Sequence, residues 1–332
     1  MLWRIHVFPR YKLIRLPTPL EKASRLGKEL GIELYVKRDD VMELALGGNK
    51  VRKLEYFLGD AITRGRDILI TKGAYHSNHA RLTAAAARKA GFDAILVLYP
   101  PGTKSLRGNL LLDKILGAEI VFAKDSEEAD RIMEELSEEL RGKGRKPYII
   151  PGGGASPLGV LGYINASLEI LQQLMDQGVR EPDYIVLATG TGATQAGLIL
   201  GLKMLGAKTR VVGISVGRSA REEKERILSL VNDTIDFLGA HNINVDMEDV
   251  VVFDNYTFGG YGAITREVIE TIEYIARMEG LILDPVYTGK AMYGLLDLVS
   301  KSYIRKGDKV VFLHTGGIPI LFQYDNIVAE YF

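Results

Sequence analysis

Short apolar runs alternate with longer amphipathic segments along most of the chain. The short runs are rich in β-branched residues, which favours strands, and the longer segments repeat their apolar positions with a helical period. Strands that alternate with helices are typical of parallel sheets joined by crossover connections. The pattern predicts strands at 32–36, 68–71, 94–98, 120–122, 148–150, 184–188, 210–216 and 309–313, and helices at 20–30, 50–62, 78–90, 106–116, 127–141, 158–175, 194–205, 220–237, 264–278 and 289–303. We therefore expect an α/β protein whose mainly parallel, twisted sheets are flanked by helices.

Two glycine-rich joints interrupt this pattern. One is Gly47-Gly48, and the other is the run of glycines that follows Pro151. Between them the sequence predicts a smaller domain of residues 51–161, inserted into a larger domain made of residues 1–50 and 162–332. The cleft between two such domains is where a ligand is expected to bind.

The helix predicted at 50–62 begins with Lys50, Arg52 and Lys53, although the first turn of a helix favours negative charge. An anion bound there would explain the cations, above all if Lys50 is converted to an imine and Lys53 faces a phosphate, as a pyridoxal phosphate enzyme requires. The alternative is a basic helix N-terminus that is simply exposed to solvent, and this segment alone supports the two interpretations equally. The positions expected to form a buried stripe on this helix are Val51, Leu54, Leu58 and Ile62.

A second segment, residues 188–197, reads ATGTGATQAG and joins a predicted strand to a predicted helix. Backbone amides at such a turn bind anions, and the hydroxyls of Thr191 and Thr194 add donors. The third glycine lies too late after Gly192 for a dinucleotide fingerprint, and no Gly-Lys-Ser/Thr follows as in nucleoside triphosphatases. The segment therefore predicts a binding cup for a single phosphate, and the alternative is a purely structural glycine turn.

Polar side chains cluster at the start of the helix predicted at 78–90. Ser77 and Asn78 are good N-cap residues. A helix start can also bind a carboxylate, and Ser77 could carry a proton beside a reacting carbon. His76 and His79 are spaced like metal ligands, but no acidic residue lies near them in the sequence, so no metal site is expected.

Two tyrosines lie in turn sequences farther along. Tyr261 stands between glycines, and Tyr287 follows Asp-Pro-Val just before a predicted helix. Taken alone, each fits a packing tyrosine. His314 and Thr315 come at the end of the last predicted strand, at the edge where parallel sheets bind ligands. His314 alone fits a structural role equally well.

Composition and charge exclude several classes of function. The 332 residues include 42 basic and 42 acidic side chains and no cysteine. Balanced charge gives no reason to expect nucleic acid or an anionic membrane as a partner, and the absence of cysteine excludes disulfides and thiolate chemistry. No membrane span or export signal is recognisable, so a cytoplasmic protein is expected. Helices rich in Glu and Lys are also compatible with a thermophilic source.

Together these segments resemble the family of D-cysteine desulfhydrases and 1-aminocyclopropane-1-carboxylate deaminases. These are pyridoxal phosphate enzymes of the tryptophan synthase β-like fold, also called fold type II, and the resemblance runs from the KRDD segment at 37–40 to the HTGG segment at 314–317. The most specific motif is GGNKVRKLE at 47–55. The resemblance implies pyridoxal 5'-phosphate as cofactor, a small amino acid as substrate and a homodimer as the assembly.

The same resemblance implies roles for single residues. Lys50 would form the imine with the cofactor and Lys53 would help to hold its phosphate. The remaining assignments are Thr191, Gly192, Ala193 and Thr194 for the phosphate cup, Asn78 for the ring hydroxyl, Ser77, Asn78 and His79 for the substrate, Tyr287 stacked on the ring and Tyr261 on the substrate side.

The two branches of this family differ at positions 288 and 315. Ring-opening deaminases carry a glutamate directly after the tyrosine of the Asp-Pro-Val-Tyr turn and a leucine after the histidine of the last motif, whereas this chain has Thr288 and Thr315. A carboxylate would keep the pyridine nitrogen protonated, whereas a threonine hydroxyl can pair with an unprotonated nitrogen. β-Elimination needs a weaker electron sink than ring opening. The two threonines therefore favour the desulfhydrase branch, with either of them as the contact to the nitrogen.

The predicted reaction converts D-cysteine to pyruvate, ammonia and hydrogen sulfide, with Lys50 or Ser77 as the base. Alternatives within enzymes are a 1-aminocyclopropane-1-carboxylate deaminase and a D- or L-serine deaminase. Alternatives outside catalysis are a pyridoxal phosphate carrier or sensor and a binding protein for another phosphorylated ligand.

Overall fold

The computed structural model describes residues 2–331, and the larger of the two sheets in this part of the chain has six strands. Their order is β1-β2-β10-β7-β8-β9, and all neighbours are parallel except β1 and β2. The strands are β1 (Leu20–Lys22), β2 (Glu33–Arg38), β7 (Tyr184–Thr189), β8 (Arg210–Ser215), β9 (Val251–Phe253) and β10 (Lys309–His314).

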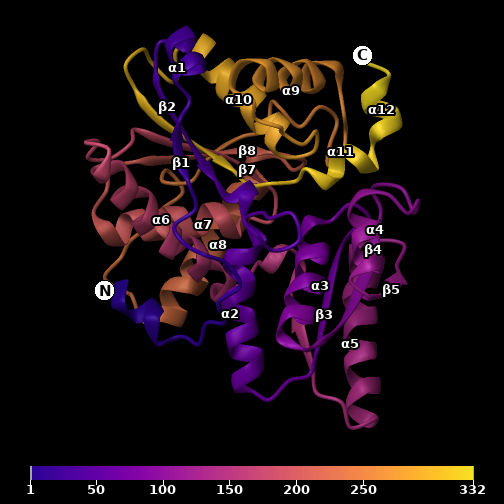
Figure 1. Cartoon of the computed structure of the whole chain (residues 1–332). Helices are drawn as coiled ribbons and strands as arrows, with labels where there is room; N and C mark the ends of the chain where they lie inside the picture. Colours follow the sequence, from indigo (N-terminus) through magenta and orange to yellow (C-terminus); the bar gives the residue numbers. More distant parts are fainter. Residues whose placement is uncertain (1, 332) are drawn as a thin grey trace.

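Helices cover both faces of the six-stranded sheet (Figure 1). Side chains alternate between the faces of a strand, so Ile185 and Leu187 lie in one hydrophobic core and Val186 between them lies in the other. The first core is closed by α6 (Pro157–Asp176), α7 (Ala193–Leu205) and α8 (Ala220–Leu238), and the second by α1 (Ser24–Leu30), α9 (Arg266–Glu279) and α10 (Thr288–Ser300).

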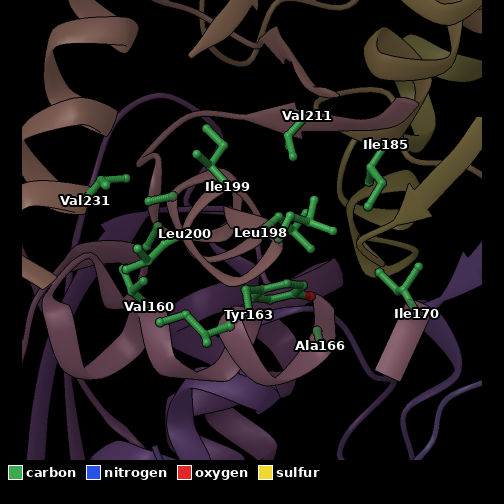
Figure 2. Packing of buried hydrophobic residues seen from close by; sticks show 14 of the residues in the cluster. Val160, Tyr163, Ala166, Ile170, Ile185, Leu198, Ile199, Leu200, Val211 and Val231 are labelled. Carbon is green, nitrogen blue, oxygen red and sulfur yellow. The ribbon is translucent and has the colours of Figure 1, made fainter. Parts of the chain in front are cut away.

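Helices α6 and α7 pack closely in the first core. Figure 2 shows Tyr163 of α6 below Leu198 of α7, and Val160 and Ile170 of α6 belong to the same core. Glycine allows this approach, because a Cβ atom on Gly197 would lie 2.5 Å from the Cβ of Tyr163. This packing fixes α7, whose start directly follows the glycine turn after β7, against α6.

The smaller sheet has four parallel strands within the described residues, in the order β5-β4-β3-β6. Its two faces are also covered (Figure 1), since Leu69 points toward α2, α3 and α4 while Ile68 and Ile70 point toward α5. The elements are β3 (Ile68–Ala74), β4 (Asp93–Tyr99), β5 (Glu119–Phe122), β6 (Pro147–Ile150), α2 (Lys50–Thr63), α3 (Asn78–Ala90), α4 (Gly108–Ile115) and α5 (Ser126–Gly142).

Short elements complete the chain. Three 3-10 turns lie at Leu2–Val7, Asp39–Val41 and Gly152–Gly154, and two short helices, α11 (Pro319–Gln323) and α12 (Asp325–Ala329), end the described part. No helix within residues 2–331 is long and apolar enough to cross a membrane.

The predicted α/β class and parallel sheets are confirmed, and the predicted elements agree with the structure to within three residues at each end, with one exception. The helix predicted at 20–30 is wrong at its start, because Leu20–Lys22 form the edge strand β1. A three-residue strand is too short to show alternation, and β9 escaped prediction for the same reason.

The prediction for α2 is also partly wrong. Ile62 was expected in the buried stripe, but it is 43% exposed because it lies at the end of the helix. Conversely, the charged residues Arg52, Lys53 and Glu55 are buried. The helix is therefore enclosed on nearly all sides, and its cations need partners inside the protein.

The strands of the two sheets come from separate stretches of the chain. The smaller sheet takes its strands from residues 68–150, and the larger sheet takes its strands from residues 20–38 and 184–314. Helices α2 and α6, which lie at the predicted domain limits, pack against each other. The limits at residues 51 and 161 therefore stay a prediction.

Candidate active site

A cavity of about 510 Å³ lies where the carboxyl ends of strands from both sheets meet. Loops that follow β3, β6, β7, β8 and β10 contribute to its wall, as expected for ligand sites in parallel sheets. The structure brings ten of the predicted site residues together around it: Lys50, Ser77, Asn78, His79, Thr191, Gly192, Thr194, Tyr261, Tyr287 and Thr315. Lys53, Ala193 and Thr288, which were also predicted, lie behind the wall.

Two lysine amines meet at the start of α2. The Nζ atoms of Lys50 and Lys53 each lie 3.3 Å from the carbonyl oxygen of Gly153. Among residues 2–331, neither amine has a carboxylate partner. In contrast, Arg52 between them is paired with Asp39 and Glu169. The two lysines are therefore the cations of this helix start whose charge is not matched by the protein.

Burial changes the protonation of both amines. It lowers the pKa of Lys50 to about 8. The pKa of Lys53 is held well below its usual value by burial and, in addition, by the charge of Lys50. Neutral amines are nucleophiles, and a phosphate would supply the missing negative charge. The pair is therefore suited to hold a ligand that carries both an aldehyde and a phosphate.

The glycine turn after β7 forms a cup at the start of α7. Gly192 is the N-cap of this helix with a φ of 81°, and a Cβ atom there would lie 2.9 Å from Cγ1 of Ile227. The first amides of the thirteen-residue helix have no partners within the helix and can bind an anion. The side chain of Thr194 accepts a hydrogen bond from Nδ2 of Asn49 at 3.0 Å. This bond connects the cup to the residue that precedes Lys50.

The start of α3 forms the opposite wall. Ser77 is the N-cap, as predicted, and its Oγ accepts from the amide of Ala80 at 3.1 Å. The side-chain oxygen of Asn78 accepts from Asn109 at 2.8 Å. His79 is buried, and its Nε2 lies 3.0 Å from Oγ1 of Thr71. Burial, together with the charges of Lys50 and Lys53, lowers the pKa of His79 well below its usual range, so its ring is neutral.

Tyr261 and Tyr287 form the side of the cavity near α10. Their hydroxyl groups are hydrogen-bonded to each other and their ring centroids lie 5.9 Å apart. Burial raises the pKa of each phenol above its usual value. Both side chains are therefore neutral hydrogen-bonding groups at neutral pH.

The two branch-specific threonines differ in position. The Thr288 hydroxyl donates to Oδ2 of Asp284 at 2.7 Å and does not line the cavity, because Asp284 lies behind the turn and binds it there. Thr315 lines the cavity, and its carbonyl accepts from the amide of Asn49 at 3.0 Å. Of the two, Thr315 is therefore placed to contact a ligand.

Some cavity residues were not found by sequence reasoning. They include five charged residues that line the cavity, namely Lys72 and Asp130 from the side of the smaller sheet and Arg218, Glu223 and Arg226 from the side of the larger sheet. The sequence feature that could have indicated them is closeness to the carboxyl end of a strand, since Lys72 lies near the end of β3 and Arg218 follows β8.

The comparisons with known proteins agree with this geometry. The model of the family described as pyridoxal-phosphate dependent enzyme matches residues 11–316. The chain belongs to this family. Its members are pyridoxal phosphate enzymes, so pyridoxal 5'-phosphate is the cofactor.

Several relatives within the pyridoxal-phosphate dependent enzymes cover nearly the whole chain. A Pyrococcus furiosus protein with the provisional name 1-aminocyclopropane-1-carboxylate deaminase is 51% identical over 98% of this chain and 96% of its own. The D-cysteine desulfhydrase of Yersinia enterocolitica is 40% identical over 96% of each chain. A crystal structure of an ACC deaminase homologue matches with a TM-score of 0.91 and 46% identity, and covers 100% of this chain and 99% of its own. The protein is thus a fold type II enzyme of the deaminase and desulfhydrase kind.

The residues present fit this cofactor on physical grounds. Lys53 is buried and Lys50 is half-buried, and neither amine has a carboxylate partner in the described residues. The cup at Gly192 offers free amides, and a Cβ atom there would collide with Ile227. An aldehyde and a phosphate on one molecule would satisfy both features at once.

Proposed function

We propose that this protein converts D-cysteine and water to pyruvate, ammonia and hydrogen sulfide. The observation that carries the proposal is the position of Thr315 on the cavity wall, together with Thr288, whose hydroxyl is occupied by Asp284. Neither position carries the residue that the resemblance leads us to expect in ring-opening deaminases, glutamate at 288 and leucine at 315. A hydroxyl partner supports a weaker electron sink, which is sufficient when a thiol leaves from the β-carbon.

Lys50 and Lys53 are proposed to hold the cofactor at its two ends. The amine of Lys50 would bind the aldehyde, and Lys53 with the amides of Gly192, Ala193 and Thr194 would hold the phosphate. The hydroxyl of Thr191 would add a donor at the same cup, since this residue also lines the cavity. When bound, pyridoxal phosphate supplies the electron sink that stabilises negative charge at the α-carbon.

The two walls are proposed to orient the ring and the substrate. Tyr287 would stack on the ring, and Asn78 would contact its hydroxyl group. The substrate carboxylate would bind at the start of α3, where Ser77, Asn78 and His79 line the cavity. The amide of Ser77 already donates to the carbonyl of Ala74 at 2.9 Å, so the amides of Asn78 and His79 would serve as donors. Tyr261 would line the substrate side, with its hydroxyl fixed by Tyr287.

The α-proton would pass to Lys50 or to Ser77. Lys50 is the better base on two grounds. Burial lowers its pKa to about 8, which places a neutral amine within reach of physiological pH. Ser77 already uses one lone pair to accept from Ala80, and a hydroxyl without a nearby base is a weak proton acceptor. The thiol then leaves from the β-carbon as hydrogen sulfide. Water hydrolyses the released enamine to pyruvate and ammonia.

The competing assignment is a 1-aminocyclopropane-1-carboxylate deaminase. It is favoured by the provisional name of the Pyrococcus furiosus relative. Serine deamination is the other alternative within enzymes. All of these reactions release a 2-oxo acid and ammonia, so the identity of the substrate is the discriminating measurement.

The test is release of 2-oxo acid from D-cysteine, L-cysteine, D-serine, L-serine, β-chloro-D-alanine and 1-aminocyclopropane-1-carboxylate. We expect the fastest turnover with D-cysteine and measurable turnover with β-chloro-D-alanine, because only a leaving group on the β-carbon is required. A Lys50→Ala variant is the control and should be inactive. Rapid turnover of another substrate with no turnover of D-cysteine would refute the assignment.

A second experiment distinguishes a pyridoxal phosphate protein from a binding protein for another phosphorylated ligand. Borohydride reduction of the holoenzyme should remove its yellow colour and leave the reduced cofactor attached to Lys50.

We further propose a homodimer in the cytoplasm, on the basis of the family resemblance and the cysteine-free composition. A thermophilic source is proposed from the Glu- and Lys-rich helices.

A further inference from the structure

Lys290 is a buried cation in the first turn of α10. Its Nζ donates to three backbone carbonyls, those of Thr257 at 2.7 Å, Gly260 at 2.9 Å and Val216 at 3.4 Å. An ammonium group has three donors, so the three carbonyls match it completely. No carboxylate bonds to it among the residues that the structure describes.

The three carbonyls belong to two segments that border the cavity. Val216 directly follows β8 and lines the cavity. Thr257 and Gly260 close a turn, in which the amide of Gly260 donates to the carbonyl of Thr257. The next residue is Tyr261. The turn itself is open, because Cβ atoms on Gly259 and Gly260 would meet nothing within 4 Å.

Lys290 therefore connects the two tyrosines of the site. It lies one turn after Tyr287, the N-cap of α10, and its ammonium holds the turn that leads into Tyr261. The two phenols meet hydroxyl to hydroxyl only if this turn keeps its position relative to α10. Packing on Gly217 and on the ring of His76 holds the Tyr261 side chain from the other side.

We propose that Lys290 is a positioning residue that fixes the Tyr261 hydroxyl on the substrate side of the cavity. It acts through the 257–261 segment and touches neither substrate nor cofactor. The expected loss of activity rests on the proposed function, but the expected loosening of the 257–261 segment does not. Loss of the charge would remove the donor that the three carbonyls share, of which Val216 is buried and Thr257 and Gly260 are half-buried.

The first measurement is hydrogen exchange in the holoenzyme of a Lys290→Met variant. Peptides that cover 257–262 are expected to exchange about tenfold faster or more, as the loss of a charge-assisted hydrogen bond implies, while β8 and α7 are unchanged. Lys301→Met is the matched control, because Lys301 ends the same helix in an exposed ion pair with Asp297. Equal exchange in the two variants would overturn the proposal.

The second measurement is the kinetics of the same variants and of Lys290→Ala. In Lys290→Met we expect kcat/KM to fall about tenfold or more. Added methylammonium should restore part of the corresponding loss in Lys290→Ala, because the shortened side chain leaves room for that cation beside the three carbonyls. Lys301→Met should match the parent protein. Activity of Lys290→Met equal to that of the control, or a loss in Lys290→Ala that methylammonium does not restore, would overturn the role.

Two further arrangements keep the result decisive. If Lys290→Met fails to fold, Lys290→Gln is used, because the glutamine amide retains two donors. Hydrogen exchange at 257–262 in Lys290→Gln should then be faster than in the parent protein but slower than in a turn without any anchor. Exchange equal to that of the parent would again refute the proposal. If the parent protein does not turn over D-cysteine but hydrogen exchange at 257–262 is faster in the Lys290 variant than in the parent, the proposed function is wrong and the role of Lys290 in holding this segment stands.

Discussion

Lys50 and Lys53 donate to one and the same acceptor, the carbonyl of Gly153, which lies 3.3 Å from each Nζ. A single neutral carbonyl cannot compensate two ammonium groups, of which one is half-buried and one buried. The structure therefore lowers the pKa of both amines, and the site is suited to a ligand that removes one charge by covalent bonding and balances the other with a phosphate.

The pH dependence of cofactor uptake follows from this relationship. Only the unprotonated amine of Lys50 can attack an aldehyde, and burial lowers its pKa from 10.5 to about 8. The initial rate of covalent uptake by the apoprotein should therefore rise with pH and reach half its maximum near pH 8. An unperturbed lysine would be neutral about a hundredfold less often at that pH. Stopped-flow absorbance gives the rate, with Lys50→Ala as the inactive control. A midpoint near pH 10 would contradict the prediction.

Substitution at the two ends of α7 separates strain from cofactor binding. Gly192 and Gly206 are its N-cap and C-cap with φ of 81° and 72°, but only at Gly192 would a Cβ atom meet a neighbour, Ile227 at 2.9 Å. Both Gly→Ala variants should lose about 1 kcal/mol of stability from the positive φ. Gly192→Ala should also weaken pyridoxal phosphate binding on the order of tenfold, because the cup amides shift.

Equilibrium titration with pyridoxal phosphate and thermal unfolding of the two variants check this contrast. Gly206→Ala is the control for strain alone, since nothing lies within 4 Å of its added Cβ atom. Equal cofactor affinity in the two variants would show that the glycine turn is structural.

The sequence was sufficient for features that depend on neighbouring residues. The strand, glycine turn and helix around Gly192 are local, and so is the Ser77 cap of α3. The burial of Arg52 and Glu55 was not accessible, because their partners Glu169 and Arg10 are 117 and 45 residues away in the chain. The sequence also could not decide which branch threonine faces the cavity, although the deciding contact spans only four residues, because a residue type does not show which way its side chain turns. That depends on Asp284 turning toward Thr288.

The two threonines should therefore respond differently to loss of their hydroxyl groups. Asp284 is buried and accepts from the amides of Val286, Tyr287 and Thr288 and from the Thr288 hydroxyl. Thr288→Val removes one of these donors and should destabilise the holoenzyme by about 1–3 kcal/mol. Thr288→Ser keeps the donor and should be close to neutral.

Thr315→Val should show the reverse behaviour. Thr315 lines the cavity, so kcat should fall on the order of tenfold with the loss of a ligand hydrogen bond, while stability changes little. Urea unfolding and steady-state kinetics on Thr288→Val, Thr288→Ser and Thr315→Val provide the comparison. A larger loss of kcat in Thr288→Val than in Thr315→Val would reverse the assignment of the cavity-facing threonine.

Glu169 should make the fold sensitive to acid. Burial alone would raise the pKa of this carboxyl, but its hydrogen bonds and ion pairs with Arg52 and Lys37 outweigh burial and lower the pKa to about 2. The unfolded carboxyl binds its proton near pH 4.5 and the folded one near pH 2. The stability that Glu169 supplies is therefore complete above pH 4.5 and is lost as the pH falls toward 2.

The expected size of this effect is about 3 kcal/mol, from the change in pKa between 4.5 and about 2. Urea unfolding between pH 2 and 7 should show a steeper acid loss in the parent protein than in Glu169→Gln, which is less stable at pH 7. Glu270→Gln is the control, because Glu270 forms only an exposed ion pair with Arg266. Equal acid slopes in parent and Glu169→Gln would refute the pairing.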